Sequence, residues 1–154
     1  MTDVDGKLQE LGLAWPVPPK PLAAYVPAVR SGNWLVVSGQ LPFRDGRLTA
    51  AGRVPSGVTL EQAQAAAQQC ILNALAIVRA ELGGDWSRLV RIVRVGAFVA
   101  SDDGFTDQAK VANGASELLL RLLGESGRHA RAAVGVNALP LGAAVEVEIL
   151  VEVR

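Results

Sequence analysis

The sequence contains very few of the residues that build metal sites and disulfides. Among its 154 residues there is one cysteine, Cys70, and one histidine, His129. A single cysteine excludes an internal disulfide, and these two residues cannot hold a metal unless carboxylates supply most of the ligands. We therefore expect no metal site. Cys70 falls on the apolar face of a predicted helix, which indicates a small buried hydrophobic residue and not a reactive thiol.

Lysine is also scarce, and neither charge predominates. The only lysines are Lys7, Lys20 and Lys110, so a Schiff-base lysine in a core strand has almost no candidate. Fifteen cations balance fifteen carboxylates, which gives a formal net charge of zero. Because binding to a phosphate backbone needs clustered cations, this balance disfavours nucleic acid as a dedicated partner.

Long apolar runs are missing as well. No segment is long enough to cross a membrane, and the first residues, Met1-Thr2-Asp3-Val4-Asp5, are acidic where a signal peptide is basic. We expect a cytoplasmic protein with no membrane partner. The motifs of serine hydrolases, nucleotide-binding loops and zinc proteases are also absent, which leaves those enzyme classes without support.

The length fits one compact domain with a short N-terminal extension. Residues 1–21 are predicted to form a strap over the surface, because the stretch from Trp15 to Pro21 is rich in proline. Leu8, Leu11 and Leu13 indicate one short helical turn within this strap. The single domain is expected to span residues 22–154.

Apolar spacing predicts the elements in the first half of the domain. Val26–Val29 and Trp34–Ser38 are expected to form a β-hairpin around a tight turn. A long amphipathic helix is predicted from a capping box at Thr59 and Gln62 as far as Gly83. One face of this helix is apolar throughout and should pack on a sheet.

The second half continues with alternating strands and helices. Leu89–Ala100 is apolar at nearly every position and is predicted to be the central strand of the sheet. A second helix should follow, capped by Asp103 or Thr106, with strands at 132–136 and 145–153. The apolar inner stripe of this second helix is predicted to consist of Ala109, Ala112, Ala115, Leu118, Leu119 and Leu122.

This order of elements predicts an α+β fold in two layers, a mixed sheet with two helices on one face. In the last strand, valines and an isoleucine point one way, while Glu146, Glu148 and Glu152 point the other way. The strand at 89–100 is apolar on both sides. The face of the sheet without helices therefore needs a cover, for which we expect another copy of the chain.

Arg131 is the strongest candidate for binding chemistry. It stands at the start of a strand of small apolar residues, and its guanidinium can bind a carboxylate through two parallel hydrogen bonds. An alternative is that Arg131 pairs with a glutamate on the neighbouring strand. A loose basic patch at Arg44, Arg47 and Arg53 is interrupted by Asp45, which favours a solvated loop over an RNA site.

Several motifs together resemble the Rid family, the YjgF-like reactive-intermediate deaminases. They are Ser38-Gly39-Gln40-Leu41-Pro42, the long helix with Asn73, Asn113 in the second helix, Ala130-Arg131-x-x-Val134-x-Val136-x-x-Leu139-Pro140, and Val145-Glu146-Val147-Glu148. The resemblance covers roughly residues 22–153 and is most specific in the last third. It implies a chorismate-mutase-like fold, a homotrimer with sites between subunits, and no cofactor.

The resemblance also implies a function and a set of residues. Members of this family hydrolyse small imines and enamines, such as 2-aminoacrylate, to 2-keto acids and ammonia. By position, Arg131 would bind the substrate carboxylate and Glu146 would activate the attacking water. Tyr25, Ser38, Gly39, Asn113 and the backbone around Ala133 would line the cleft. An arginine beside Glu146 would keep that carboxylate ionised.

Two departures from the family pattern bear on the activity. Ala133 replaces a common hydroxyl or thiol residue, and His129 replaces a common proline, so the chain resembles a divergent subgroup. His129 is either a group that tunes the cleft or an ordinary loop histidine. The alternatives to a deaminase are a trimer that binds a small carboxylate without turnover, and an endoribonuclease or translation inhibitor.

Overall fold

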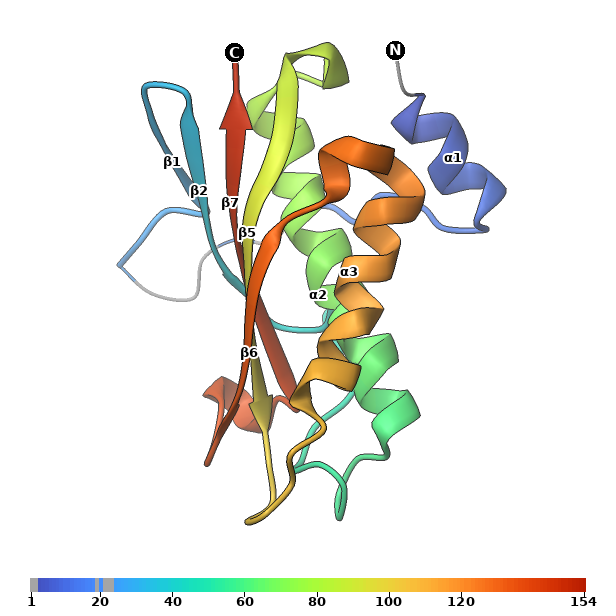
Figure 1. Cartoon of the computed structure of the whole chain (residues 1–154), viewed down its shortest axis with the longest axis vertical. Helices are drawn as coiled ribbons and strands as arrows, with labels where there is room; N and C mark the ends of the chain where they lie inside the picture. The colour runs from blue at the N-terminus through green and yellow to red at the C-terminus, as the bar shows by residue number, and fades with distance from the viewer. Residues whose placement is uncertain (1–2, 19, 21–23) are drawn as a thin grey trace.

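The computed structural model describes residues 3–18, 20 and 24–154, and it has the predicted α+β architecture. A five-stranded sheet in the order β1-β2-β7-β5-β6 packs on one face against two long helices, α2 and α3 (Figure 1). Its strands are β1 Ala28–Ser31, β2 Trp34–Gln40, β5 Leu89–Ala100, β6 Ala130–Val136 and β7 Val145–Val153. The remaining elements are α1 Val4–Glu10, β3 Phe43–Arg44, β4 Arg47–Leu48, α2 Leu60–Glu81, η1 Trp86–Arg88, α3 Gln108–Leu123, η2 Gly124–Gly127 and η3 Pro140–Gly142.

The hairpin and the long helix are confirmed, although Val26 and Pro27 precede β1 and the strand extends to Ser31. β1 and β2 pair antiparallel, and Thr59 and Gln62 form the capping box, with Gln62 N donating to Thr59 Oγ1 at 3.1 Å. Cys70 is fully buried in the core, and burial raises the pKa of its thiol well above the ordinary value. The interpretation of Cys70 as a buried hydrophobic residue is therefore confirmed.

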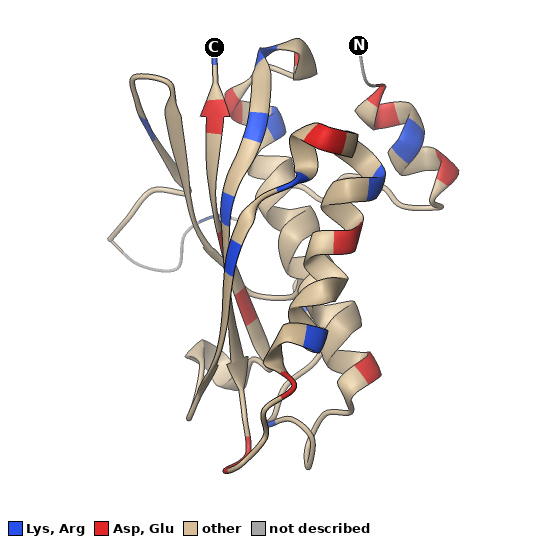
Figure 2. Cartoon of the chain, in the orientation of Figure 1, with Lys and Arg blue, Asp and Glu red and all other residues tan. Residues whose placement is uncertain are grey.

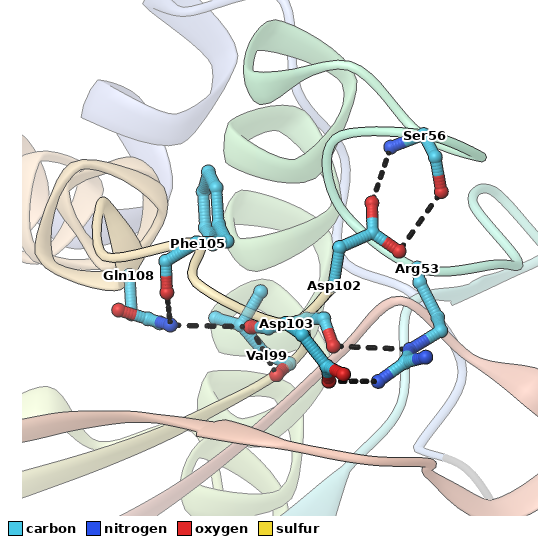
Figure 3. Close-up of polar contacts among 8 residues, drawn as sticks. Arg53, Ser56, Val99, Asp102, Asp103, Phe105 and Gln108 are labelled. Carbon is cyan, nitrogen blue, oxygen red and sulfur yellow. Dashed lines mark hydrogen bonds and ion pairs between the residues drawn. The ribbon is translucent and has the colours of Figure 1, made fainter.

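The start of α3 differs from the prediction. The helix begins at Gln108, and neither Asp103 nor Thr106 caps it. Instead the Gln108 side chain donates to the backbone carbonyl of Phe105 at 2.7 Å (Figure 3). Ala109, which was expected on the inner stripe, is exposed, whereas Val111 is fully buried.

The loop before α3 is tied to the loop before α2 by polar contacts, which Figure 3 shows. Ser56 donates to the Asp102 carboxylate through its backbone N–H at 2.8 Å and its hydroxyl at 2.9 Å. Arg53 donates to the carbonyl of Ser101 at 3.0 Å and lies 3.6 Å from Asp103. These contacts fix the end of β5 from which α3 departs.

β7, and not β5, is the middle strand of the sheet. β7 pairs antiparallel with both β2 and β5, and β5 also pairs parallel with β6. The prediction that 89–100 is the central strand was wrong by one position. Both strands have neighbours on either side, so an apolar run could not distinguish the two places.

The N-terminal segment packs on the main body. Two apolar residues of α1 are buried in the same core as the long helices. Asp5 on α1 accepts hydrogen bonds from Trp15 at 2.6 Å, from Arg79 at 3.2 Å and from Trp86 at 3.4 Å. The rings of Trp15 and Trp86 stack with centroids 5.5 Å apart. Of the predicted proline-rich stretch, Pro19 and Pro21 lie outside the described residues.

The two faces of the sheet differ as the alternation in β7 predicts. The odd-numbered residues of β7 are buried against the helices, and the glutamates of β7 lie on the opposite face of the sheet. Figure 2 shows carboxylates on β7 and cations on the adjacent β5. Large apolar side chains are also exposed on this face, namely Val29, Trp34, Val36 and Val134.

Candidate functional site

The predicted site residues divide into two groups on opposite faces of the sheet. Arg131 is in register with Val95 of β5, whose side chain is fully buried on the helix side. Glu146 is in register with Phe98 and alternates with buried valines, so its side chain lies on the face without helices. One chain by itself therefore does not bring Arg131 and Glu146 together.

The first group is built around the Arg131 guanidinium, which three groups of α3 hold at the edge of the sheet. Nη1 donates to Asn113 Oδ1 at 2.9 Å and to Ser116 Oγ at 3.0 Å, and Nη2 donates to the carbonyl of Ala109 at 3.3 Å. None of these partners is a carboxylate. The alternative in which Arg131 pairs with a strand glutamate is therefore wrong, and Arg94 makes that contact instead, with Glu148 at 3.3 Å.

These contacts leave part of the guanidinium unused. Of its five N–H donors, three bind α3, so the Nε–H and one Nη2–H have no acceptor within residues 24–154. Neighbouring donors on one guanidinium plane bind both oxygens of a carboxylate. Since Arg131 is exposed, this edge is open to a small anion.

His129 belongs to the same group. Its Nε2 lies 2.9 Å from Ser116 Oγ, and its Nδ1 lies 2.6 Å from the carbonyl of Gly127. Because a carbonyl only accepts, Nδ1 carries the proton, and Nε2 of the neutral ring then accepts from the Ser116 hydroxyl. Burial and the nearby charge of Arg131 lower the pKa of His129, although the bond to Gly127 acts in the opposite direction.

The second group consists of Glu146 with Ser38 and Gly39. Gly39 lies at an irregularity in the pairing of β2 with β7, and a Cβ atom there would collide with the Glu146 carboxylate. Glycine at this position leaves room for the Glu146 carboxylate beside β2 in the orientation observed. The Ser38 hydroxyl donates to the carbonyl of Val26 at 2.7 Å. This bond ties β2 to the segment that precedes β1, which also contains Tyr25.

The environment of Glu146 corrects one expectation. The sequence predicts that a neighbouring arginine keeps this carboxylate ionised. The structure places Arg131 on the other face, and partial burial together with the nearby Glu148 carboxylate raises the pKa of Glu146 above its ordinary 4.5. A carboxylate with a raised pKa accepts a proton more readily, which suits it to take one from water.

Tyr25 and Gly39 also line a cavity of about 680 Å³ between the N-terminal segment, the end of β2 and α2. Most of its wall is apolar, with side chains from Leu13, Trp15, Val17, Leu41, Phe43 and Leu72. Cavities of this size commonly bind small molecules. Neither Arg131 nor Glu146 lines it, so this cavity alone does not contain the predicted chemistry.

Ala133 lies two residues after Arg131 on β6 and is half-buried against the core. β6 pairs with β5 only, so its other edge carries backbone donors and acceptors that face outward. The backbone around Ala133 therefore lies on the same exposed strand edge as the backbone of Arg131. The role that the resemblance implies for Ala133 stays a prediction.

The sequence did not identify Ser116 or Ala109 as part of the site. Both lie on α3 with Asn113, and both bind the guanidinium of Arg131. A helical period of three to four residues places Asn113 and Ser116 on one face, but the pairing with β6 is visible only in the fold.

In the described residues, no cluster of three His, Cys, Asp or Glu side chains is arranged around a metal position. No described helix is long and apolar enough to span a membrane.

A protein-family model described as endoribonuclease L-PSP matches residues 16–153 of this chain. Protein TCP17 of Trypanosoma cruzi is 47% identical over 152 residues, which cover 98% of this chain and 94% of that protein. A protein of Dermatophagoides farinae named 2-iminobutanoate/2-iminopropanoate deaminase is 28% identical over 142 residues, 92% of this chain and 95% of that one.

Among solved structures, one from Shewanella oneidensis, provisionally described as an endoribonuclease, superposes with a TM-score of 0.94. It is 30% identical in sequence, and the match covers 97% of this chain and 99% of that one. A likeness over the full length of both chains confirms the predicted fold class.

Proposed function

We propose that this chain, which belongs to the endoribonuclease L-PSP family and is similar to a relative named as an imine deaminase, hydrolyses small imines derived from amino acids. The observation that carries the proposal is the Arg131 guanidinium, which three acceptors of α3 hold with two donors left for a carboxylate. The products would be a 2-keto acid and ammonia.

The chemistry needs few groups. Arg131 binds the substrate carboxylate, and a water molecule attacks the imine carbon while Glu146 takes one of its protons and passes it to the imine nitrogen, which gives a carbinolamine. Glu146 then takes the proton of the new hydroxyl and delivers it to the amine. The carbon–nitrogen bond breaks as the carbonyl forms, and ammonia leaves. An enamine substrate first takes a proton on carbon to become the imine. The raised pKa of Glu146 supports this proton transfer in both directions.

The proposal includes a site formed between copies of the chain, in the homotrimer that the family resemblance implies. Arg131 with Asn113 lies on the helix side of β6, and Glu146 with Gly39 lies on the opposite face of the sheet. A second copy can bring its Arg131 to the Glu146 of the first. The exposed apolar side chains on the face with Glu146 support such a contact.

The first test is removal of Arg131. Arg131→Ala should reduce ammonia release from an enzymatically generated imine by about a hundredfold, because the cation that binds the substrate carboxylate is lost. Arg131→Lys keeps the charge but not the paired donors, and should remain impaired. Arg121→Ala, which removes an exposed arginine in the last turn of α3, is the matched control. Equal activity in all variants would exclude the proposal.

The second test asks whether two copies share one site. Arg131→Ala and Glu146→Gln are each expected to be inactive, and co-expression of the two variants should restore about a quarter of the wild-type sites if each site takes one residue from each copy. No recovery in mixed assemblies would contradict a shared site. Binding of 2-oxobutanoate without any turnover would instead favour a carboxylate-binding protein.

A further inference from the structure

Resting on the proposed function, we infer that Ser116 and His129 are positioning residues, which hold the Arg131 guanidinium in the orientation that binds the substrate carboxylate. The three side chains form a continuous chain of hydrogen bonds from the loop before β6, through α3, to the edge of the sheet. The hydrogen-bond link from His129 to Arg131 runs through the Ser116 hydroxyl.

The direction of the hydrogen bonds follows from the donor inventory. Arg131 only donates, so Ser116 Oγ accepts from Nη1 and its own proton is free to point elsewhere. That proton meets His129 Nε2 at 2.9 Å, and this nitrogen is an acceptor because the ring proton is on Nδ1, facing the carbonyl of Gly127. Arg131 therefore donates to Ser116, Ser116 donates to His129, and His129 donates to the carbonyl of Gly127, so all three hydrogen bonds run in the same direction.

These hydrogen bonds fix the plane of the Arg131 guanidinium. Exposed arginine side chains lose considerable rotamer entropy when they bind a ligand. Here Asn113 and Ser116 hold both Nη1 protons from one helix, and His129 fixes the rotation of the Ser116 hydroxyl. The Nε edge is thus oriented before the carboxylate arrives, so less entropy is lost on binding.

The supports of this chain are themselves rigid. Gly114 lets α3 approach α2 so closely that a Cβ atom there would collide with the backbone carbonyl of Gln64. Gly127 likewise lies against the backbone carbonyl of Leu119 on α3. The turn before His129 is therefore packed directly against this helix. Ser116 and His129 therefore keep their separation with little freedom to adjust.

The charged groups near His129 come from several elements. His129 lines a shallow surface depression together with Arg91 of β5, Arg128 of the preceding turn and Glu152 of β7. Of the charged side chains, Arg131 is the one whose charge lowers the pKa of His129. Burial and this charge favour the neutral ring that the hydrogen-bond chain requires.

The test compares binding of 2-oxobutanoate, measured by calorimetry at pH 7.5, with kinetics of imine hydrolysis in a coupled amino-acid-oxidase assay. Ser116→Ala should weaken binding about tenfold, because it removes a hydrogen bond to a charged group. His129→Leu should weaken it by a smaller factor, and the double variant should bind no worse than Ser116→Ala alone. The loss is expected in KM, with kcat at saturation nearly kept, whereas partial unfolding would lower kcat.

Two variants serve as controls. Ser126→Ala deletes a hydroxyl for which no hydrogen bond exists among the described residues, and it should bind like the wild type. His129→Gln offers an acceptor that does not titrate, and it should recover part of the affinity that His129→Leu loses. Additive losses in the double variant would show that His129 does not act through Ser116.

The outcomes separate this inference from the proposed function. If Arg131→Ala abolishes binding while Ser116→Ala and His129→Leu leave it unchanged, the positioning roles are wrong and the deaminase proposal stands. If the wild type binds 2-oxobutanoate but releases no ammonia, the proposed function is wrong, and the binding constants alone decide the positioning roles. If the wild type does not bind this carboxylate, Arg131 is no anchor and the inference is overturned.

Discussion

At the scale of single residues, the identity of a functional side chain is easier to predict than its neighbours. Arg131 stands out in the sequence as an arginine among small apolar residues. Its observed partners, however, are Asn113, Ser116 and a backbone carbonyl. The alternative, a pair with a glutamate of the neighbouring strand, is made by Arg94, which contacts Glu148. Which face a strand residue occupies follows from register, and register is a property of the folded sheet.

Glu146 gives a prediction at this scale. Because its pKa is raised in the folded protein, the folded state binds more protons than the unfolded state between the ordinary value of 4.5 and the raised value. Stability therefore falls as pH rises through this window. We expect Glu146→Gln to raise the melting temperature at pH 7, with a gain that disappears towards pH 4.5. Thermal melts at several pH values measure it.

Glu148→Gln is the matched comparison, because it removes a carboxylate that Arg94 already pairs with at 3.3 Å. Because Glu148 also repels Glu146, this variant should raise the melting temperature at pH 7, but by less than Glu146→Gln, since burial is the larger cause of the raised pKa of Glu146. Loss of the exposed ion pair with Arg94 contributes little in either direction. A gain for Glu146→Gln of the same size at all pH values would show that its charge is not the cause.

At the scale of elements, local signals predict where a regular segment exists better than where it begins. The capping box at Thr59 and the glycine after α2 give both ends of that helix. α3 lacks a side-chain cap, and its start at Gln108 depends on bonds to Phe105 and Ser101 that only the folded loop provides.

The N-terminal segment carries the prediction at this scale. Its assignment as a strap separate from the domain stays a prediction, and Leu8, which is 1% exposed in the core, can test it. Leu8→Ala should lower the free energy of unfolding by about 2–4 kcal/mol, because a buried leucine leaves a cavity. Urea unfolding measures the change, with the half-buried Leu11→Ala expected to cost less. An unchanged unfolding free energy would mean that α1 unfolds independently.

At the scale of the whole molecule, the described chain places the two halves of the proposed site on opposite faces of one sheet. Arg131 points to the helix layer, and Glu146 points to the uncovered face. That face also exposes about half of the Trp34, Val36 and Val134 side chains. A face with this composition is expected to be covered in the working assembly.

Val134 tests this expectation. It is 45% exposed and in register with Phe98 on the uncovered face. Val134→Asp should weaken association of the copies, because it places a charge in an apolar contact, and should reduce activity with it. Analytical ultracentrifugation measures the association. Val17→Asp, at a more exposed position outside the sheet, should leave it unchanged. Association that resists Val134→Asp would exclude this face as the interface.

The amino-acid sequence alone determined the class of fold, and it predicted candidate residues for the site. Apolar periodicity is local, so it specified the long helix, the strands and the alternation in β7. The spacing of Arg131, Leu139-Pro140 and Glu146 carried the resemblance to a family of deaminases. These properties depend on residues that are near one another along the chain.

Only the tertiary structure decided how the site residues are grouped. The parallel pairing of β6 with β5 turns Arg131 towards α3, and the antiparallel pairing of β7 turns Glu146 away from it. The hydrogen bonds that join Ser116 and His129 to Arg131 follow from the same packing. Strand register and helix docking arise from contacts between distant segments, for which a single sequence carries no local signal.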